Sequence, residues 1–143
     1  MPISNNLFYF LKNNMMKFDG HESGNHGKLI NDVAKNPHDY GIRGRIENCF
    51  KNVMVKDSYL DTHCDIFIKT PEDYCIVKAK TGKLNVEYSD MMNMYRFFRK
   101  NFNICPQMIV AFSHNLKYRG NKRYVYFKRP ISDLAGVLNK ERN

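Results

Sequence analysis

The run Met108 to Phe112 is the feature that most constrains the fold of this chain, because every one of its side chains is apolar. A strand with this pattern must be covered on both faces by other parts of the protein. The preceding segment, 87–101, places Tyr88, Met91 and Phe98 on one face of a helix and basic residues on the other. A doubly covered strand beside an amphipathic helix predicts a layered α/β domain.

Three β-like runs come before that helix, and turn-forming residues separate them. The runs are 53–56, 63–69 and 74–80, and the last two predict a hairpin. Before the first run, the apolar residues Ile42, Ile46, Cys49 and Phe50 recur at helical spacing and predict a short helix. The expected order of elements is therefore α-β-β-β-α-β, followed by a strand over 124–127 and a helix over 131–138.

The length of 143 residues is typical of one domain. Residues 1–40 are expected to form an N-terminal extension, with a helix over 4–16 and a loop that contains a short helix near 29–34. Residues 41–128 are expected to form the core, and residues 129–143 a C-terminal helix and tail.

The net charge of +9, from 23 Lys and Arg against 14 Asp and Glu, predicts attraction to polyanions, with nucleic acid as the leading partner. No apolar run approaches the roughly 18 to 20 residues that span a bilayer, and the first residues do not resemble a signal peptide. We expect a soluble intracellular protein, cytoplasmic or nuclear, without a membrane partner. The four cysteines show no CxxC spacing and three of them lie in apolar segments, which favours buried reduced thiols over a zinc site or a disulfide framework.

Charged side chains gather on the second and third β-like runs. Asp61, His63 and Asp65 can share one face of their strand, and Lys78 and Lys80 share a face of the next strand. Glu47 lies on the helix expected before them. Together they predict a phosphodiester-cleaving site, with carboxylates that hold Mg²⁺ or Mn²⁺ and a lysine that stabilises charge or positions water.

The order of elements, with Asp65 before the turn and Lys80 after it, resembles the PD-(D/E)xK nuclease superfamily, and within it the small Holliday junction resolvases. The resemblance covers residues 41–128 and implies a restriction-endonuclease-like core, with a mixed central sheet flanked by helices. Asp65 matches the first carboxylate, Lys80 the lysine, and Glu47 the helical glutamate that many members use as a metal ligand. The resemblance also implies a metal-dependent endonuclease that acts on DNA in preference to RNA, and a homodimer.

Lys78 departs from this pattern, because it occupies the position of the family's second acid. An ammonium group there would repel a divalent cation. Catalysis by Asp65, Lys78 and Lys80 would then require a replacement carboxylate or imidazole, for which the sequence offers Asp61, His63, Glu72, Asp73, Glu87 and Asp90. Without one, Asp65 forms an ion pair with Lys78 or Lys80, and Glu47 pairs with Arg43. His21 and His26 have no surrounding ligand array that predicts a metal site.

Basic residues near this site are expected to grip the phosphate backbone. The segment 117–124 interleaves cations with Tyr118 and Tyr124, whose rings can stack on unpaired bases. The expected nucleic-acid contacts are Lys83, Arg96, Arg99, Lys100, Lys117, Arg119, Lys122 and Arg123.

Three functions remain open from the sequence. The first is a metal-dependent endonuclease, and the second is an inactive pseudo-nuclease that binds nucleic acid through Lys78 and Lys80. The third is an interaction subunit of a larger assembly, similar to the small RNA polymerase subunit whose jaw domain resembles this fold. In that case the apolar segment 7–11 would form an interface.

Overall fold

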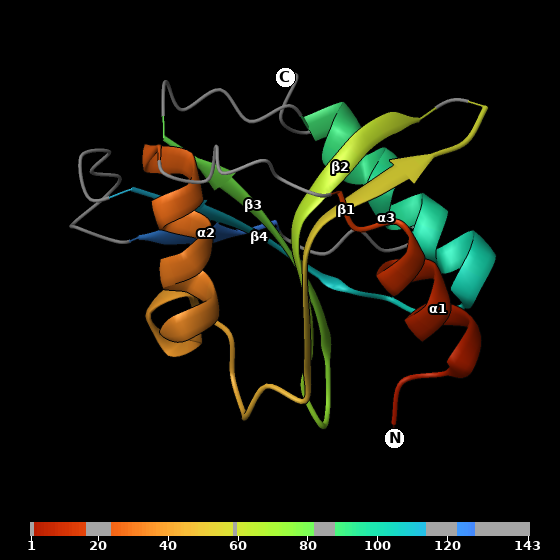
Figure 1. Ribbon diagram of the computed structural model, residues 1–143, viewed down its shortest axis with the longest axis horizontal. Coiled ribbons are helices and arrows are strands. Elements are labelled where there is room, and N and C mark those ends of the chain that lie inside the picture. The colour runs from red at the N-terminus through yellow and green to blue at the C-terminus, as the bar shows by residue number, and fades with distance from the viewer. Residues whose placement is uncertain (1, 17–23, 59, 82–87, 114–122, 128–143) are drawn as a thin grey trace, which may run out of the picture.

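The computed structural model describes residues 2–16, 24–58, 60–81, 88–113 and 123–127. Its centre is a five-stranded sheet in which the strands lie side by side in chain order (Figure 1). The strands are β1 (Asn48–Lys56), β2 (Asp61–Lys69), β3 (Tyr74–Lys80), β4 (Gln107–Phe112) and β5 (Tyr124–Tyr126). Only β3 and β4 pair in parallel, so the sheet is mixed.

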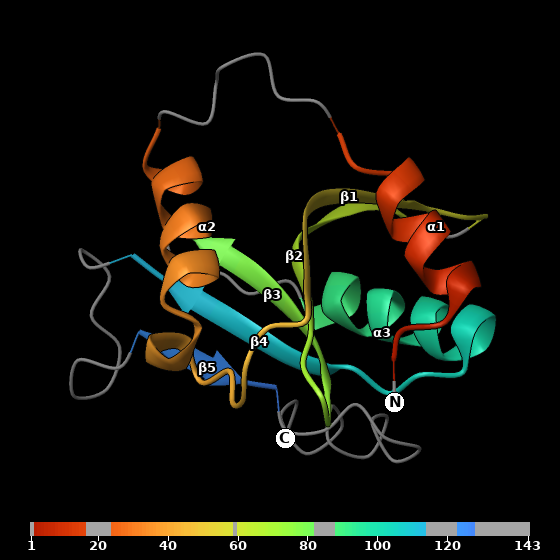
Figure 2. The same cartoon turned by 60° about the horizontal axis from the view of Figure 1, so that its bottom comes forward.

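Helices cover both faces of the sheet. They are α1 (Asn5–Asn13), α2 (Asn25–Lys35), the short 3-10 helix η2 (Pro37–Tyr40) and α3 (Tyr88–Phe102). α2 lies on one face, and α1 and α3 lie on the other (Figures 1 and 2). The predicted layered α/β arrangement is therefore confirmed, and Met108 to Phe112 is buried between the layers as its apolar pattern requires.

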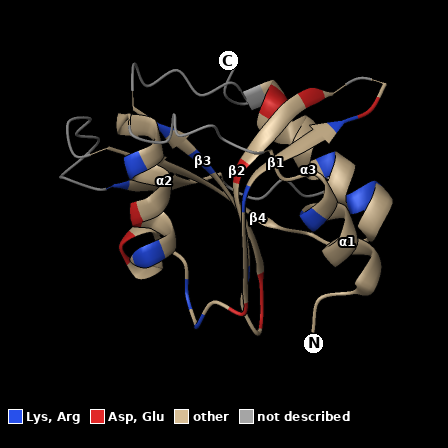
Figure 3. Ribbon diagram, viewed as in Figure 1, with Lys and Arg blue, Asp and Glu red and all other residues tan. Residues whose placement is uncertain are grey.

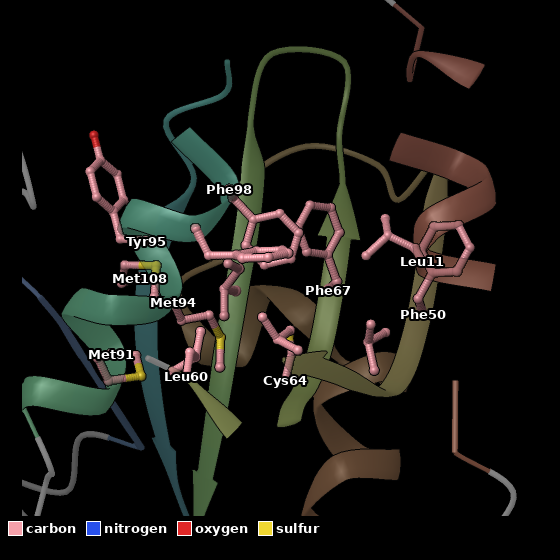
Figure 4. Packing of buried hydrophobic residues seen from close by; sticks show 14 of the residues in the cluster. Leu11, Phe50, Leu60, Cys64, Phe67, Met91, Met94, Tyr95, Phe98 and Met108 are labelled. Atoms are coloured by element: carbon pink, nitrogen blue, oxygen red, sulfur yellow. The ribbon is translucent and has the colours of Figure 1, made fainter. Parts of the chain in front are cut away.

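Two apolar clusters fill the space between the sheet and its helices. The α3-side cluster is built around Phe98, whose ring lies 5.1 Å from that of Phe67 (Figure 4). Its buried members are Leu7, Leu11, Phe50, Val53, Val55, Leu60, Cys64, Phe67, Ile76, Met91, Met94, Tyr95, Phe97, Phe98, Met108, Val110 and Phe112. The α2-side cluster contains Leu29, Ile30, Val33, Tyr40, Ile42, Ile66, Ile68, Cys75, Val77, Ala79, Ile109 and Ala111.

The alternation of side chains between the two faces of β1 shifts by one residue near Asn52, so that the strand exchanges its faces there. Val53 and Val55 belong to the same cluster as Phe50, although strict alternation would place them on the opposite face. Between them, Asn52 has a φ of 56°, in the left-handed region that asparagine tolerates better than most residues. The reversed backbone at Asn52 therefore coincides with the exchange of faces.

Strand β2 makes the same exchange opposite Asn52. Cys64 shares a cluster with Phe67, although alternation would place it with Ile66 on the α2 side. Asp65 lies at the exchange, between the ladder pairs Lys51↔Ile66 and Val53↔Cys64. The two strands thus bend together, and Asp65 sits at the bend.

Most expected elements are present, with one correction. The hairpin, the long helix and the strand over 108–112 are confirmed, and the turn is closed by hydrogen bonds between Thr70 and Asp73. The helix expected over 42–50 is wrong, because the chain is irregular up to Glu47 and enters β1 at Asn48. Its apolar residues instead pack against the sheet from a loop and a strand. The helix expected over 131–138 lies outside the described residues.

We expect Asn52→Gly to be more stable than Asn52→Ala by about 1 kcal/mol, because a left-handed backbone penalises any Cβ. Both variants lose the same side-chain amide, so the comparison isolates the backbone. Urea denaturation measures the difference. At an ordinary backbone position, alanine is more stabilising than glycine. If Asn52→Ala proved more stable than Asn52→Gly, the backbone at Asn52 would not be constrained to the left-handed region.

Candidate functional site

Asp65 is a fully buried carboxylate at the point where β2 leaves β3. The β2–β3 ladder ends at Ile66↔Val77, and beyond it the Asp65 side chain takes the place of a strand partner. Its Oδ2 accepts a hydrogen bond of 2.8 Å from the amide of Ala79. Strand β3 meanwhile continues its parallel pairing with β4 through Lys80↔Phe112. The carboxylate therefore joins β2 to β3 where the backbone no longer does.

Two imidazoles face the other oxygen of Asp65. Oδ1 lies 3.0 Å from His63 Nε2 and 3.6 Å from His26 Nε2. Neither contact has hydrogen-bond geometry, so within the described chain Oδ1 is buried without a hydrogen-bond partner. The histidine side chains are 35% and 45% exposed respectively, whereas Asp65 is 0% exposed. The rings therefore lie between a buried charge and solvent.

Lys78 completes this group, which we call the Asp65 cluster: His26, His63, Asp65 and Lys78. The Lys78 ammonium lies 3.9 Å from Asp65 Oδ2 and is partly exposed. The cluster draws on α2, β2 and β3, and the arrowheads of β3 and β4 end beside α2 in Figure 2. It places one negative charge among three basic groups.

The surroundings of Asp65 determine its ionisation. Burial is the largest influence and opposes the charged form, but the two histidines, Lys78 and the Ala79 amide together hold the pKa of Asp65 well below its usual range. In return, the contact with Asp65 raises the pKa of His26 above its ordinary value, against the opposing effects of burial and Lys78. Asp65 is thus an anion across the physiological range, and its charge favours protonation of His26.

Lys78 lies beside Asp65, as the sequence suggested, but Glu47 lies beside Lys69 instead. The Glu47 amide donates to the carbonyl of Lys69 at 2.7 Å, and its carboxylate lies 3.4 Å from Lys69 Nζ. Lys69 is four residues beyond Asp65 on β2, about 13 Å at the usual rise of a strand. Glu47 is therefore not positioned as a ligand beside Asp65. Lys80 follows Lys78 on β3 and is partly buried, and its carbonyl accepts from the Ser113 amide.

Of the residues proposed to replace the missing acid, His63 is the one that contacts Asp65 within the described chain. Glu72 and Asp73 lie in the turn between β2 and β3, at the other end of that strand pair. Asp61 opposes Lys56 at the start of β2, and Asp90 lies in the first turn of α3. Glu87 lies outside the described residues.

The expected nucleic-acid contacts that the structure describes do not gather at the Asp65 cluster. Arg96, Arg99 and Lys100 are exposed on α3, and the last two lie in its final turn. Because α3 returns the chain from the end of β3 to the start of β4, this turn is at the opposite end of the sheet from Lys80. Lys and Arg are spread over helices on both sides of the sheet (Figure 3).

Arg123 lies 3.8 Å from Asp39, beside η2, and so partly neutralises an acidic side chain. Four of the expected nucleic-acid contacts, Lys83, Lys117, Arg119 and Lys122, lie outside the described residues.

The residues around Asp65 do not fit the Mg²⁺ or Mn²⁺ site expected from the resemblance. Mg²⁺ requires mainly oxygen ligands in octahedral geometry, and Mn²⁺ also favours oxygen. Here one carboxylate is accompanied by two imidazoles and an ammonium group. No group of three or more His, Cys, Asp or Glu in the described segments has the arrangement of a metal site.

No protein-family model, curated protein or solved structure matches the chain. Among the helices in the described part of the chain, none is long and apolar enough to cross a membrane. All four cysteines are free thiols, but only Cys64 and Cys75 are buried, whereas Cys49 is half-buried and Cys105 is exposed. Burial raises the pKa of Cys64 well above its ordinary value.

We expect His26→Ala to lower the free energy of unfolding more at about pH 5.5 than at about pH 8.5. The pKa of His26 is raised in the folded state, so its stabilising contribution is fully present below the unfolded pKa. It is lost as the pH rises through the folded pKa. Urea denaturation of both proteins at the two pH values measures this.

Asp65→Asn is the matched control for that experiment, because it removes the charge that raises the pKa of His26 while keeping an oxygen near Ala79. In the Asp65→Asn background, His26→Ala should no longer have the larger effect at about pH 5.5, because burial and Lys78 then lower the pKa of His26. An equal pH dependence in both backgrounds would show that Asp65 is not its source.

Proposed function

We propose that the chain is a nucleic-acid-binding protein of the PD-(D/E)xK fold, in which the Asp65 cluster contacts the phosphate backbone. The observation that supports this most directly is the location of the cluster. A buried acid on β2 lies where that strand separates from β3, and lysines follow on β3 at the same place. These are the positions at which the resemblance puts its motif.

The arrangement of the sheet also supports the proposed fold. The elements α2, β1, β2, β3, α3 and β4 follow the order α-β-β-β-α-β, with a mixed sheet between helical layers. The first helix of that order is α2, whereas the sequence pattern had suggested residues 42–50. This shift replaces Glu47 by His26 as the residue that the first helix brings to the site.

The chemistry of the cluster favours an anion over a cation. Lys78 stands where the family has an acid, and its ammonium group is partly exposed beside two imidazoles that also reach solvent. Asp65 is already surrounded by basic groups and does not need an added cation for charge balance. Lysines and protonated histidines bind phosphate oxygens well. The net charge of +9 adds a general attraction to polyanions.

We expect Lys78→Met to weaken binding to labelled nucleic acid and to reduce the slope of log affinity against log salt by about one. Single-stranded and duplex DNA and RNA are titrated in EDTA by fluorescence anisotropy at several salt concentrations. Lys35→Met is the matched control, because Lys35 is an exposed lysine in the last turn of α2, far from His26 along the helix. An equal loss in both variants would argue against a phosphate contact at the cluster.

The same titration tests the metal-dependent endonuclease, when Mg²⁺ or Mn²⁺ replaces EDTA and the products are resolved on a gel. Cleavage that requires the metal and disappears in Asp65→Asn would establish that enzyme and reject an inactive binder. If neither binding nor cleavage is detected, the proposed function fails. Sizing the protein alone and with nucleic acid then tests the two assembly proposals, a homodimer and an interaction subunit.

A further inference from the structure

The two histidines of the Asp65 cluster are arranged as a pair. Both present Nε2 to the same carboxylate oxygen, at 3.0 Å for His63 and 3.6 Å for His26. The negative charge of Asp65 favours, in each ring, the tautomer with its proton on Nε2 over the one that brings a lone pair to Oδ1. In a neutral ring, Nδ1 then holds the free lone pair. The two rings are close neighbours, because both Nε2 atoms contact the same oxygen and their separation cannot exceed the sum of the two contact distances.

The single charge of the shared carboxylate can balance only one imidazolium ion. One negative charge on Asp65 favours protonation of one imidazole, and a second protonation would place two imidazolium ions beside each other and beside Lys78. His26 is the ring whose pKa is raised. An imidazolium at His26 next to a second imidazole ring provides an acid beside a base, which is the requirement for concerted proton transfer.

The remaining groups at this place suit a phosphodiester. Lys78 supplies a positive charge near both rings. His26 is in the first turn of α2, whose N-cap is Gly24 and makes no side-chain hydrogen bond to the first amides. Amides at such a helix end attract phosphate oxygens. Among the described residues, the Cys64 thiol is a further ionisable group near Asp65 and Lys78, and burial together with the Asp65 charge keeps it protonated.

We propose that His26 and His63, positioned by Asp65, cleave RNA by transesterification without a metal ion. This inference rests on the proposed function, since the substrate must first bind. His63 Nδ1 takes the proton of the 2′-hydroxyl while O2′ attacks the adjacent phosphorus. The bond from phosphorus to O5′ breaks, and His26 gives its proton to O5′. The products are a 2′,3′-cyclic phosphate and a 5′-hydroxyl, and Lys78 stabilises the charge on the phosphorus oxygens.

The 2′-hydroxyl makes RNA the substrate, against the DNA expected from the resemblance. A metal-bound water is not needed, because the nucleophile is part of the substrate. This is consistent with the poor fit of the cluster to Mg²⁺. DNA of the same sequence would bind through its phosphates but stay intact.

To test this, the full chain is incubated in EDTA with three end-labelled substrates. They are an RNA, a DNA of the same sequence, and the same RNA with single 2′-deoxy substitutions. We expect cleavage of RNA only, a cyclic phosphate on the 5′ fragment, and no cut at a deoxy position. His26→Ala and His63→Ala should each lower the rate about a hundredfold or more while RNA binding is retained. His38→Gln, purified in parallel, is the control for contaminating nuclease, because His38 contacts the Ile42 carbonyl outside the cluster.

The role of Asp65 has its own readout. A general base and a general acid give a bell-shaped dependence of rate on pH, whose alkaline limb follows loss of the proton from His26. Asp65→Asn removes the charge that favours this proton, so the alkaline limb should move to lower pH. A merely structural loss would lower the rate without moving the limb. Thermal melts of each variant identify any that fail to fold, and His26→Gln and His63→Gln then replace them.

Two results would overturn the inference in different ways. RNA binding without cleavage in EDTA would reject the catalytic pair and leave the proposed function intact. Cleavage that appears only with Mg²⁺, Mn²⁺ or Zn²⁺ would make the histidines metal ligands instead of proton carriers. If RNA and DNA both fail to bind, the proposed function itself is wrong.

Discussion

The buried charge of Asp65 is the constraint on which the rest of this structure depends. A carboxylate taken fully out of water costs several kcal/mol unless its oxygens find partners. Here the Ala79 amide hydrogen-bonds one oxygen, with Lys78 close by, and two imidazole rings face the other. Removing any one of them would leave the charge less compensated. The positions of α2, β2 and β3 are therefore coupled through a single side chain.

Asp65 reaches these partners because the sheet bends where it stands. The left-handed backbone at Asn52 lies opposite Asp65, and both strands exchange their faces at this level. A regular β2 would keep alternating past Ile66 and would place Cys64 on the α2 side. The bend places Cys64 with Phe67 instead, in the α3-side cluster. Backbone conformation and side-chain electrostatics thus act together at one point of the fold.

The ammonium group of Lys78 limits what the surroundings of Asp65 can bind. Two acids near each other at the end of a strand pair attract a divalent cation, whereas one acid among basic groups is already neutralised. The basic groups in turn acquire a defined orientation from the acid. The site therefore consists of two imidazoles and an ammonium group around one fixed negative charge. The chemistry follows from the balance of charges and not from the fold alone.

The sequence by itself determined the layers and most of the elements, because hydrophobic periodicity is a local property. The apolar run at Met108 to Phe112 required cover on both faces, and the alternating runs before it required a hairpin. It also indicated that His63 and Asp65 share a face. Local periodicity failed over 42–50, where an apolar spacing compatible with a helix belongs to a loop and a strand. Packing against the sheet decided that segment.

Tertiary structure alone decided the composition of the candidate site. His26 reaches Asp65 from a helix far away in the chain, and no local spacing connects the two residues. Glu47, which matched a family pattern, meets Lys69 instead because β1 starts just after it. Neighbours across a sheet are set by strand register and by the bend at Asn52, which depend on contacts among many residues. The residue types that can carry the chemistry are written in the sequence, but only folding determines which of them meet.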